Sequence, residues 1–192
     1  MLRRMTRERF LSDAELERFM AAVRDRRHKN QPRDHALFVL LANTGIRPSE
    51  ALALRRADLQ LEGRAPWIRL HRAPRKHAPA PTNELEISRP VAAVLKRYCD
   101  EMDQQQKLFA YTKRQSWRLF HYYSAKAGLP MSYRIYSLRH TAGMRLYRYT
   151  RDIRLVQAIM GHQRLVSSSI YQHLSPDVIR QTIEAASEGV VR

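Results

Sequence analysis

The sequence predicts a mainly α-helical fold with one small antiparallel β-hairpin. Apolar residues recur at helical spacing along most of the 192 residues, and prolines and a capping pattern mark several helix starts. Only the stretch between Gly63 and Ser88 changes to short segments typical of strands. A hydrophobic fraction of 44% is enough for one domain with a real core.

Three helices are predicted in the first part of the chain. A capping-box pattern that starts at Ser12 opens the first helix. Pro32 opens the second, and its apolar run over residues 36–42 indicates burial on nearly all sides. Gly45 is expected to end this helix, and Pro48 to open a short third one.

The predicted hairpin pairs a strand over residues 67–71 with a strand over residues 84–87. A basic, proline-rich loop joins them, and Lys76 lies near its tip. Pro90 then opens another helix. Apolar periodicity predicts further helices over residues 113–127, 138–149, 153–160 and 176–186.

The charge of the chain favours an anionic partner. There are 35 lysines and arginines against 18 aspartates and glutamates, which gives a net charge of +17. Residues 104–151 contain no acidic side chain at all. Such a surface attracts polyanions, so nucleic acid is the leading expectation. On charge alone, RNA, an acidic protein or a membrane surface stay open, although no basic amphipathic helix stands apart from the core.

The sequence contains no candidate membrane-spanning segment and no pair of cysteines. The longest apolar run, residues 36–42, is far shorter than the roughly 20 residues that cross a bilayer, and the N-terminus has no apolar signal-peptide core. We therefore expect a cytoplasmic protein. Cys99 is the only cysteine, which excludes an internal disulfide and a cysteine-based metal site. We expect Cys99 to be a small buried hydrophobic residue.

Four residues carry the chemical signal: Arg47, Arg139, His162 and Tyr171. A tyrosine can form a covalent bond to phosphorus, and arginine offers fixed cationic donors that match phosphate oxygens. Arg47 is predicted at a corner between two helices, and Arg139 at a helix start, where backbone N–H groups favour an anion. His162 follows a predicted helix, and Tyr171 follows the polar turn 167–169.

Short motifs around these four residues resemble those of the tyrosine recombinase, or phage integrase, family. They occur in the family's order at residues 44–52 (TGIRPSEAL), 137–141 (SLRHT), 160–162 (MGH) and 171–173 (YQH). The resemblance runs from about residue 11 to residue 186 and implies the fold of the family's catalytic domain. It implies a site-specific DNA recombinase, of the kind found in mobile genetic elements, that cleaves and rejoins strands through a 3′-phosphotyrosyl intermediate.

The same resemblance implies a role for each matching residue. Tyr171 is the expected nucleophile, Arg47 and Arg139 hold the nonbridging phosphate oxygens, and His162 donates to the same phosphate. Lys76 matches the family lysine that protonates the departing 5′-oxygen. Because cationic side chains stabilise the developing charge, we expect no metal and no ATP.

Positions beside the two arginines have supporting or altered roles. Glu50 is expected to orient Arg47 or its neighbours, and His140 to be a structural residue at a helix start. Most family members have a histidine three positions before the second arginine, where this chain has Tyr136. A tyrosine with a pKa of about 10 donates hydrogen bonds but is a poor base near neutral pH. The general base is left open between His162 and water, and a packing role for Tyr136 is the alternative.

Expected roles also follow for a set of histidines, for the aromatic residues and for further arginines. A zinc site made by His140, His162 and His173 is not expected, because their spacing matches no usual ligand pattern. The aromatic residues among the basic ones are expected in the core rather than stacked on bases: Trp117, Phe120, Tyr122, Tyr123, Tyr147 and Tyr149. The arginines expected to contact DNA are Arg72, Arg75, Arg114, Arg118, Arg145 and Arg148.

The resemblance also predicts an organisation and partners. We expect a single catalytic domain over residues 1–192, with a basic segment at 1–10 and no N-terminal helical domain. An isolated catalytic domain and a natural short recombinase both fit this expectation. Residues 175–192 resemble a helix that relatives pack against a neighbouring subunit, with packing on its own domain as the alternative. The expected partners are double-stranded DNA and further copies of the chain, as a tetramer on paired sites. A catalytically impaired DNA-binding relative and a type IB topoisomerase-like enzyme are the alternative functions.

Overall fold

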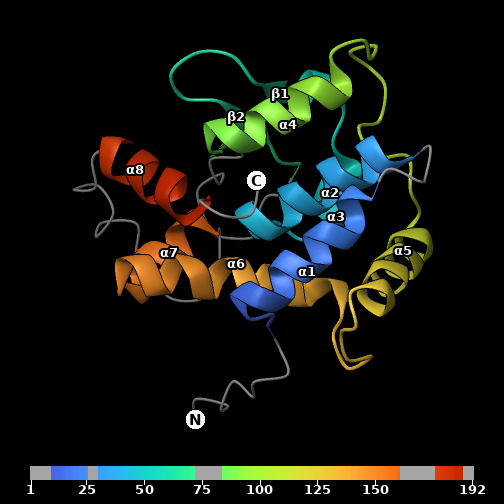
Figure 1. Ribbon diagram of the computed structural model, residues 1–192. Coiled ribbons are helices and arrows are strands. Elements are labelled where there is room, and N and C mark those ends of the chain that lie inside the picture. Colours follow the sequence, from blue (N-terminus) through green and yellow to red (C-terminus); the bar gives the residue numbers. More distant parts are fainter. Residues whose placement is uncertain (1–9, 26–29, 72–83, 161–175, 188–192) are drawn as a thin grey trace, which may run out of the picture.

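Helices dominate the computed structural model, which describes residues 10–25, 30–71, 84–160 and 176–187 (Figure 1). The helices are α1 (Asp13–Arg24), α2 (Gln31–Thr44), α3 (Pro48–Ala53), the 3-10 turn η2 (Arg56–Asp58), α4 (Arg89–Cys99), α5 (Lys113–Lys126), α6 (Ile135–Thr150), α7 (Ile153–Ile159) and α8 (Pro176–Ser187). The strands are β1 (Leu59–Gln60), β2 (Trp67–Arg69) and β3 (Glu84–Glu86). The predicted fold class is confirmed.

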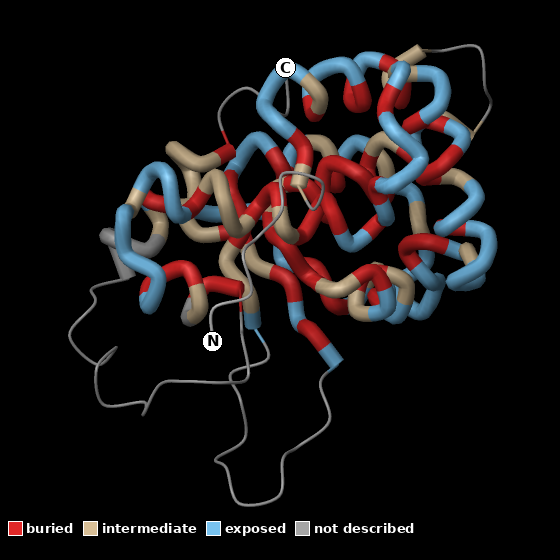
Figure 2. The backbone as a smooth tube through the Cα atoms, turned by 90° about the horizontal axis from the view of Figure 1, so that it is seen from below, coloured by how far each residue is buried: buried red, intermediate tan, exposed pale blue. Residues whose placement is uncertain are grey.

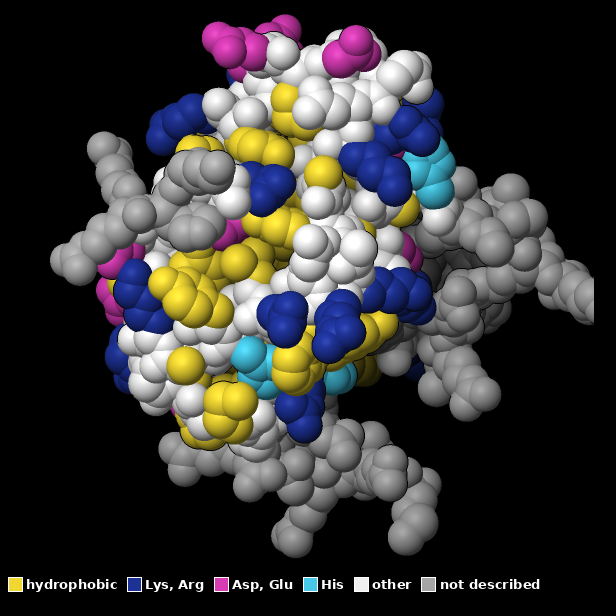
Figure 3. Space-filling view, turned by 90° about the vertical axis from the view of Figure 1, so that its right-hand side faces the viewer, with side chains coloured by type: hydrophobic (Ala, Val, Ile, Leu, Met, Phe, Trp, Pro, Cys, Tyr) yellow, Lys and Arg dark blue, Asp and Glu magenta, His cyan; other side chains and the backbone are white. Residues whose placement is uncertain are grey.

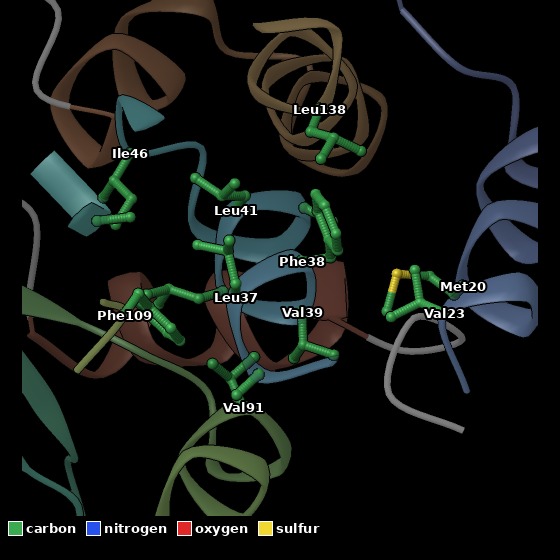
Figure 4. Packing of buried hydrophobic residues seen from close by; sticks show 14 of the residues in the cluster. Met20, Val23, Leu37, Phe38, Val39, Leu41, Ile46, Val91, Phe109 and Leu138 are labelled. Atoms are coloured by element: carbon green, nitrogen blue, oxygen red, sulfur yellow. The ribbon is translucent and has the colours of Figure 1, made fainter. Parts of the chain in front are cut away.

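Helix α2 lies at the centre, with α1, α4 and α6 packed around it (Figure 1). Its residues 36–42 are all at most 1% exposed, as their unbroken apolar run predicts. In Figure 4, Leu37 points toward Phe109 and Phe38 toward Leu138, so the helix fills the core in several directions. Figure 2 shows the buried backbone running through the middle of the molecule.

The predicted helix ends near the N-terminus are confirmed. The Ser12 N–H donates to Glu15 Oε2 at 2.8 Å, and the Glu15 N–H donates to Ser12 Oγ at 3.3 Å, which completes the capping box. Gly45 ends α2 in the left-handed region with φ 63°, and its N–H donates to the Leu41 carbonyl. Pro48 opens α3.

The predicted hairpin is present and gains a third strand. β2 pairs antiparallel with β3, with Ile68 opposite Leu85, and β1 pairs with β2 through Leu59 opposite Ile68. Strand β1 was not predicted because it is only two residues long, too short for alternation to be recognised. The loop that carries Lys76 lies outside the described residues.

Helix α6 begins earlier than its sequence predicts, and this corrects the placement of Arg139. The helix starts at Ile135 instead of residue 138, because the Ser137 hydroxyl accepts from the Arg134 N–H and closes a capping box. Ser137 therefore lies inside the first turn and is not the cap. Arg139 and His140 are in the second turn, so the predictions that they stand at a helix start are wrong.

The prediction that the aromatic residues are in the core is only partly right. Phe120 and Tyr123 are buried along with Ser116, so these three mark the stripe by which α5 meets the core. The other aromatic side chains lie off the buried stripes and are 37–57% exposed: Trp117, Tyr122, Tyr147 and Tyr149. Cys99 is fully buried as expected, and burial raises the pKa of its thiol.

A second apolar cluster holds α7 and α8 against α6. It consists of Leu146, Leu155, Val156, Ile159 and Met160, with Ile183 and Ala186 packed on it. Arg180 Nε donates to Glu86 Oε1 at 2.7 Å, and Glu184 Oε1 accepts from the Arg89 N–H at 2.9 Å. In the chain taken alone, α8 therefore packs on its own domain. None of the described helices has both the length and the apolar character to span a membrane.

A buried carboxylate fastens α2 to α5 and to the segment before it. Asp34 is completely buried and accepts hydrogen bonds from the hydroxyls of Tyr111 and, at 2.7 Å, Tyr123. The Arg33 guanidinium lies 4.0 Å from the centre of the Tyr111 ring. Burial raises the pKa of both tyrosine hydroxyls well above the ordinary value for tyrosine, and the hydrogen bond to Asp34 is the second cause.

This cluster predicts a loss of stability at alkaline pH. The unfolded chain releases its tyrosine protons near pH 10, whereas the folded chain keeps those of Tyr111 and Tyr123 to higher pH. Their contribution is complete below about pH 10 and is lost as the pH rises above it. The free energy of unfolding, measured with urea between pH 7 and 11, should fall less steeply with rising pH for Tyr123→Phe than for the wild type. The exposed control Tyr149→Phe should behave like the wild type. Equal slopes for all three would contradict the assignment.

Candidate active site

Arg47 lies at the corner between α2 and α3 and is held by Glu50. Its extended backbone caps α3, and its N–H donates to Glu50 Oε2 at 2.7 Å. Its guanidinium Nη1 donates to Glu50 Oε1 at 2.8 Å. The Glu50 side chain is 9% exposed and that of Arg47 30% exposed, so a nearly buried carboxylate orients a partly accessible cation. The contact expected between these two residues is present.

Arg139 connects three parts of the chain. Its side chain is 6% exposed in the second turn of α6. Nη1 donates to the carbonyl of Gly45, and Nη2 donates to the carbonyl of Met160 at 3.2 Å. Gly45 precedes Arg47 by two residues, so the structure brings the segments of the two predicted arginines together.

A pocket of about 420 Å³ opens beside Arg139, between α6 and α7. Its walls are mainly apolar, with Arg139 and His140 as the basic members. The lining residues are Arg139, His140, Gly143, Met144, Tyr147, Ile153, Val156 and Met160. Because apolar walls weaken the screening by water, a charge that binds here interacts strongly with the guanidinium.

Tyr136 and His140 flank Arg139 on α6 in different environments. Tyr136 precedes Arg139 by about one helical turn, so the two side chains are neighbours on the helix surface. Its side chain is 46% exposed, so Tyr136 is not part of the buried core. His140 is half-buried in the pocket wall.

The exposed face of α5 carries two of the arginines predicted to contact DNA. Arg114 and Arg118 are exposed there, together with the aromatic side chains of Trp117 and Tyr122. Figure 3 looks onto this side of the molecule and shows basic side chains around hydrophobic and histidine side chains. This arrangement of cations and flat rings suits a nucleic-acid surface.

Arg145 and Arg148 lie on α6 but away from Arg139. Arg148 follows Arg139 by nine residues, which is half a turn around the helix, and its Nη1 pairs with Asp13 Oδ2 at 2.9 Å. Arg145 is half-buried, and this burial lowers the pKa of its guanidinium. The structure therefore turns this pair toward α1 and does not bring it together with the two arginines of the candidate site.

Several predicted site residues lie outside the described part of the chain: Lys76, His162, Tyr171, Arg72 and Arg75. Their roles stay predictions, and the expectation that His140, His162 and His173 form no zinc site is not tested, because His162 and His173 lie outside the described residues. Within residues 10–25, 30–71, 84–160 and 176–187, no three His, Cys, Asp or Glu side chains are grouped to hold a metal ion.

Sequence reasoning missed the contribution of Gly143 and Met160. Gly143 follows Arg139 by four residues, so both are on one face of α6, and this face meets α7. A glycine inside an otherwise regular helix, on the same face as a predicted site arginine, was the available signal, because such a glycine often marks a close approach.

The sequence is similar to those of known proteins. The family model described as "Phage integrase family" matches residues 9–177. The chain is 25% identical over 169 residues to tyrosine recombinase XerA of Pyrococcus furiosus, covering 83% of this chain and 56% of the relative. It is 28% identical over 173 residues to tyrosine recombinase XerD of Neisseria meningitidis serogroup B, covering 86% and 58%.

A solved structure has the same fold. The crystal structure of the XerH site-specific recombinase bound to difH substrate, in a pre-cleavage complex, superimposes with a TM-score of 0.68 at 24% identity. The match covers 90% of this chain and 53% of that one. The chain thus spans a little over half the length of the proteins that it matches.

Two glycines with the same backbone conformation test the close packing at this site. Gly45 has φ +63° and Gly128 has φ +65°, but a Cβ on Gly45 would lie 2.7 Å from Met160 Cε, whereas a Cβ on Gly128 would meet nothing within 4 Å. Left-handed strain alone costs about 1–2 kcal/mol. We expect Gly128→Ala to lower the free energy of unfolding by about that amount and Gly45→Ala to lower it further, measured by urea denaturation. Equal losses of unfolding free energy in the two variants would show that the Met160 side chain moves aside at no cost.

Proposed function

We propose that this chain, which belongs to the phage integrase family, cleaves and rejoins DNA strands as a site-specific recombinase. The observation that carries the proposal is the position of Arg139, whose guanidinium joins the end of α2, two residues before Arg47, to the end of α7. The printed names of XerA and XerD, both tyrosine recombinases, support the reaction. The XerH complex with difH substrate supports DNA as the partner.

In the proposed reaction, Tyr171 Oη attacks a phosphodiester, and a bond to phosphorus forms while the bond to the 5′-oxygen breaks. The tyrosine proton passes to His162 or water, and Lys76 gives a proton to the departing 5′-oxygen. The product is a 3′-phosphotyrosyl link with a free 5′-hydroxyl. Because the link conserves the bond to phosphorus, the reverse attack by a 5′-hydroxyl rejoins the strand without ATP.

Arg47 and Arg139 stabilise the charge that develops on the phosphate. Both guanidinium groups are already oriented by partners, Arg47 by Glu50 and Arg139 by two carbonyl groups. Fixed donors need little reorganisation during the reaction, which is the main source of electrostatic catalysis. These cations supply the charge stabilisation, so the proposed steps include no metal ion.

Tyr136 donates a hydrogen bond to the same phosphate in this proposal. Its exposed side chain, about one turn before Arg139, supports contact with a bound substrate. The proposal gives Tyr136 a donor role only, because phenol hydroxyls in general are poor bases near neutral pH. The base is therefore His162 or water.

DNA binding rests on the basic surface. In this proposal Arg114 and Arg118, which are exposed on α5, contact phosphates. Arg72 and Arg75, which lie outside the described residues, are given the same role. Arg145 and Arg148 contribute less, because they face Asp13. Binding of a protein with a net charge of +17 weakens steeply with salt. A DNA substrate also fits the expected cytoplasmic location.

The active assembly proposed here is a tetramer on two paired DNA sites. If α8 packs on a neighbouring subunit in that assembly, it must first leave its own domain. This release breaks the contacts of Arg180 with Glu86 and of Glu184 with the Arg89 N–H. The described packing of α8 is then the form of the free chain.

A nicked suicide substrate tests the proposed reaction. After cleavage, the short piece between the cleavage site and the nick, which carries the free 5′-hydroxyl, diffuses away. The strand then cannot be rejoined, so the covalent adduct accumulates. A pooled library of nicked duplexes, with inverted repeats from the DNA beside the gene included, removes dependence on one guessed site. We expect an SDS-resistant adduct with the wild type and none with Tyr171→Phe.

The same experiment separates the alternative functions. DNA retention by the wild type without any adduct from the whole library would favour a catalytically impaired DNA-binding relative. Relaxation of an arbitrary supercoiled plasmid that depends on Tyr171 would favour the topoisomerase-like alternative. Tighter binding of RNA than of duplex DNA, without adducts, would favour an RNA-binding protein.

Glu50→Gln should slow adduct formation while leaving DNA affinity nearly unchanged. The substitution keeps the shape of the side chain but removes the charge that holds Arg47, and small misplacements of a reacting group cost about 10- to 100-fold in rate. Single-turnover adduct formation and gel-shift affinity measure the two effects. Glu62→Gln is the matched control, because it removes the acidic member of an exposed pair with Lys96. Equal rates for the two variants would exclude the orienting role.

A further inference from the structure

We propose that Met160 is a positioning residue, which sets the guanidinium of Arg139 and the corner that carries Arg47 in one arrangement. The inference rests on the proposed function, because the arrangement matters for stabilising the charge that develops on the phosphate during cleavage. It assigns a role to a residue that is neither charged nor a predicted catalyst.

The Met160 side chain lies against two glycines that belong to different elements. A Cβ on Gly45, at the end of α2, would lie 2.7 Å from Met160 Cε. A Cβ on Gly143, in α6, would lie 2.9 Å from Met160 Sδ. Met160 itself is 3% exposed. The thioether thus fills a space that exists because both neighbouring positions lack a side chain.

The backbone of Met160 is held at the same place by a different interaction. Arg139 Nη2 donates to the Met160 carbonyl at 3.2 Å, and Nη1 donates to the Gly45 carbonyl. Gly45, Arg139 and Met160 therefore form a closed ring of contacts: two hydrogen bonds through the guanidinium and one packing contact through the thioether. Each contact fixes the geometry of the other two.

This ring restricts the guanidinium in a way that one partner would not. A guanidinium is planar, and donors on both Nη atoms are engaged, so the two carbonyl positions define the orientation of the plane. The first carbonyl belongs to the turn before Arg47. The second belongs to the end of α7, and the Met160 side chain sets its distance from that turn.

Methionine suits this place for a physical reason. Its side chain is unbranched and flexible, so it enters a narrow gap between two backbones where a β-branched side chain would not fit. The other residues of the second cluster, Leu146, Leu155, Val156 and Ile159, hold α7 on α6 by ordinary packing. Met160 is the member of this cluster that also reaches the corner at Gly45.

A structural test follows from the restricted guanidinium. In the wild type, we expect resolved ¹⁵N-bound Nη–H signals from one slowly rotating arginine, identified by their disappearance in Arg139→Lys. Met160→Ala keeps the backbone carbonyl but removes the thioether side chain that sets its position. We therefore expect these signals to broaden or merge. Leu155→Ala, in the same cluster, is the control and should retain them. Retention of the signals in Met160→Ala would overturn the proposal.

A kinetic test separates positioning from simple stability. Met160→Ala and Leu155→Ala should lower the thermal midpoint by similar amounts and leave DNA affinity at the wild-type value. At saturating protein and a temperature at which both are folded, only Met160→Ala should slow single-turnover adduct formation, by about 10- to 100-fold. Met160→Leu, which nearly conserves the volume, should restore most of the rate. Equal slowing by Met160→Ala and Leu155→Ala would show that Met160 contributes only as a core residue and has no positioning role.

The double variant Gly143→Ala, Met160→Ala provides a further check. Gly143→Ala alone places a Cβ against the sulfur, whereas removing the methionine side chain makes room for it. The two substitutions together should therefore slow the reaction less than the product of their separate effects. Independent effects would contradict the contact.

The two tests fail in different ways if the proposed function is wrong. A wild type without any Tyr171-dependent adduct rejects the recombinase reaction, and the role of Met160 in that reaction with it. The guanidinium signals still decide whether Met160 orients Arg139. Altered signals in Met160→Ala, combined with a wild-type adduct rate, would show an orientation without consequence for the reaction and would overturn the proposal.

Discussion

The buried guanidinium of Arg139 is the interaction on which the arrangement of the candidate site depends. A positive charge that is 6% exposed is costly unless hydrogen-bond acceptors surround it. Two of these acceptors are the carbonyls of Gly45 and Met160, from segments that are distant in sequence. The charge can be buried at low cost only when α2, α6 and α7 are all in place, so the folded arrangement and the readiness to bind an anion have the same cause.

The rest of the fold provides the rigid setting for this contact. α2 is buried on nearly all sides and ends in a cap at Gly45, so the carbonyl that Arg139 binds lies directly after a well-buried helix. The left-handed conformation at Gly45 then turns the chain toward Arg47. Glu50, fixed at the start of α3, completes the corner by holding the side chain of that arginine.

Most of the fold was predictable because its signals are local. Capping residues, helix-opening prolines and the apolar run of α2 each specify a structure within a few neighbours in the sequence. The start of α6 was placed wrongly because Ser137 fits a cap as well as it fits the third position of a capping box, and only the contact with Arg134 decides between them. Strand β1 has only two residues, so no alternation can be recognised in it, and only its pairing with β2 defines it.

The candidate site was predictable in its residues more than in its geometry. The motifs identified Arg47, Glu50 and Arg139, and the family membership that they implied was confirmed. They did not indicate that Arg139 binds backbone carbonyls, because carbonyl groups carry no sequence signature. They also did not indicate that Arg148 faces Asp13, since the helical period places it half a turn away but does not name its partner.

The separation of the apolar residues into two clusters has a consequence for folding. α6 contributes Leu138 to the main core and Leu146 to the smaller cluster, so it belongs to both. The smaller cluster has few members and holds α7 and α8, and units with little buried apolar surface open at lower free energy than the rest of a protein. Such an opening would leave Arg139 and Gly45 in place while withdrawing the Met160 carbonyl. This packing therefore favours two cooperative units of unequal stability, and the boundary between them would pass through the hydrogen bonds of Arg139.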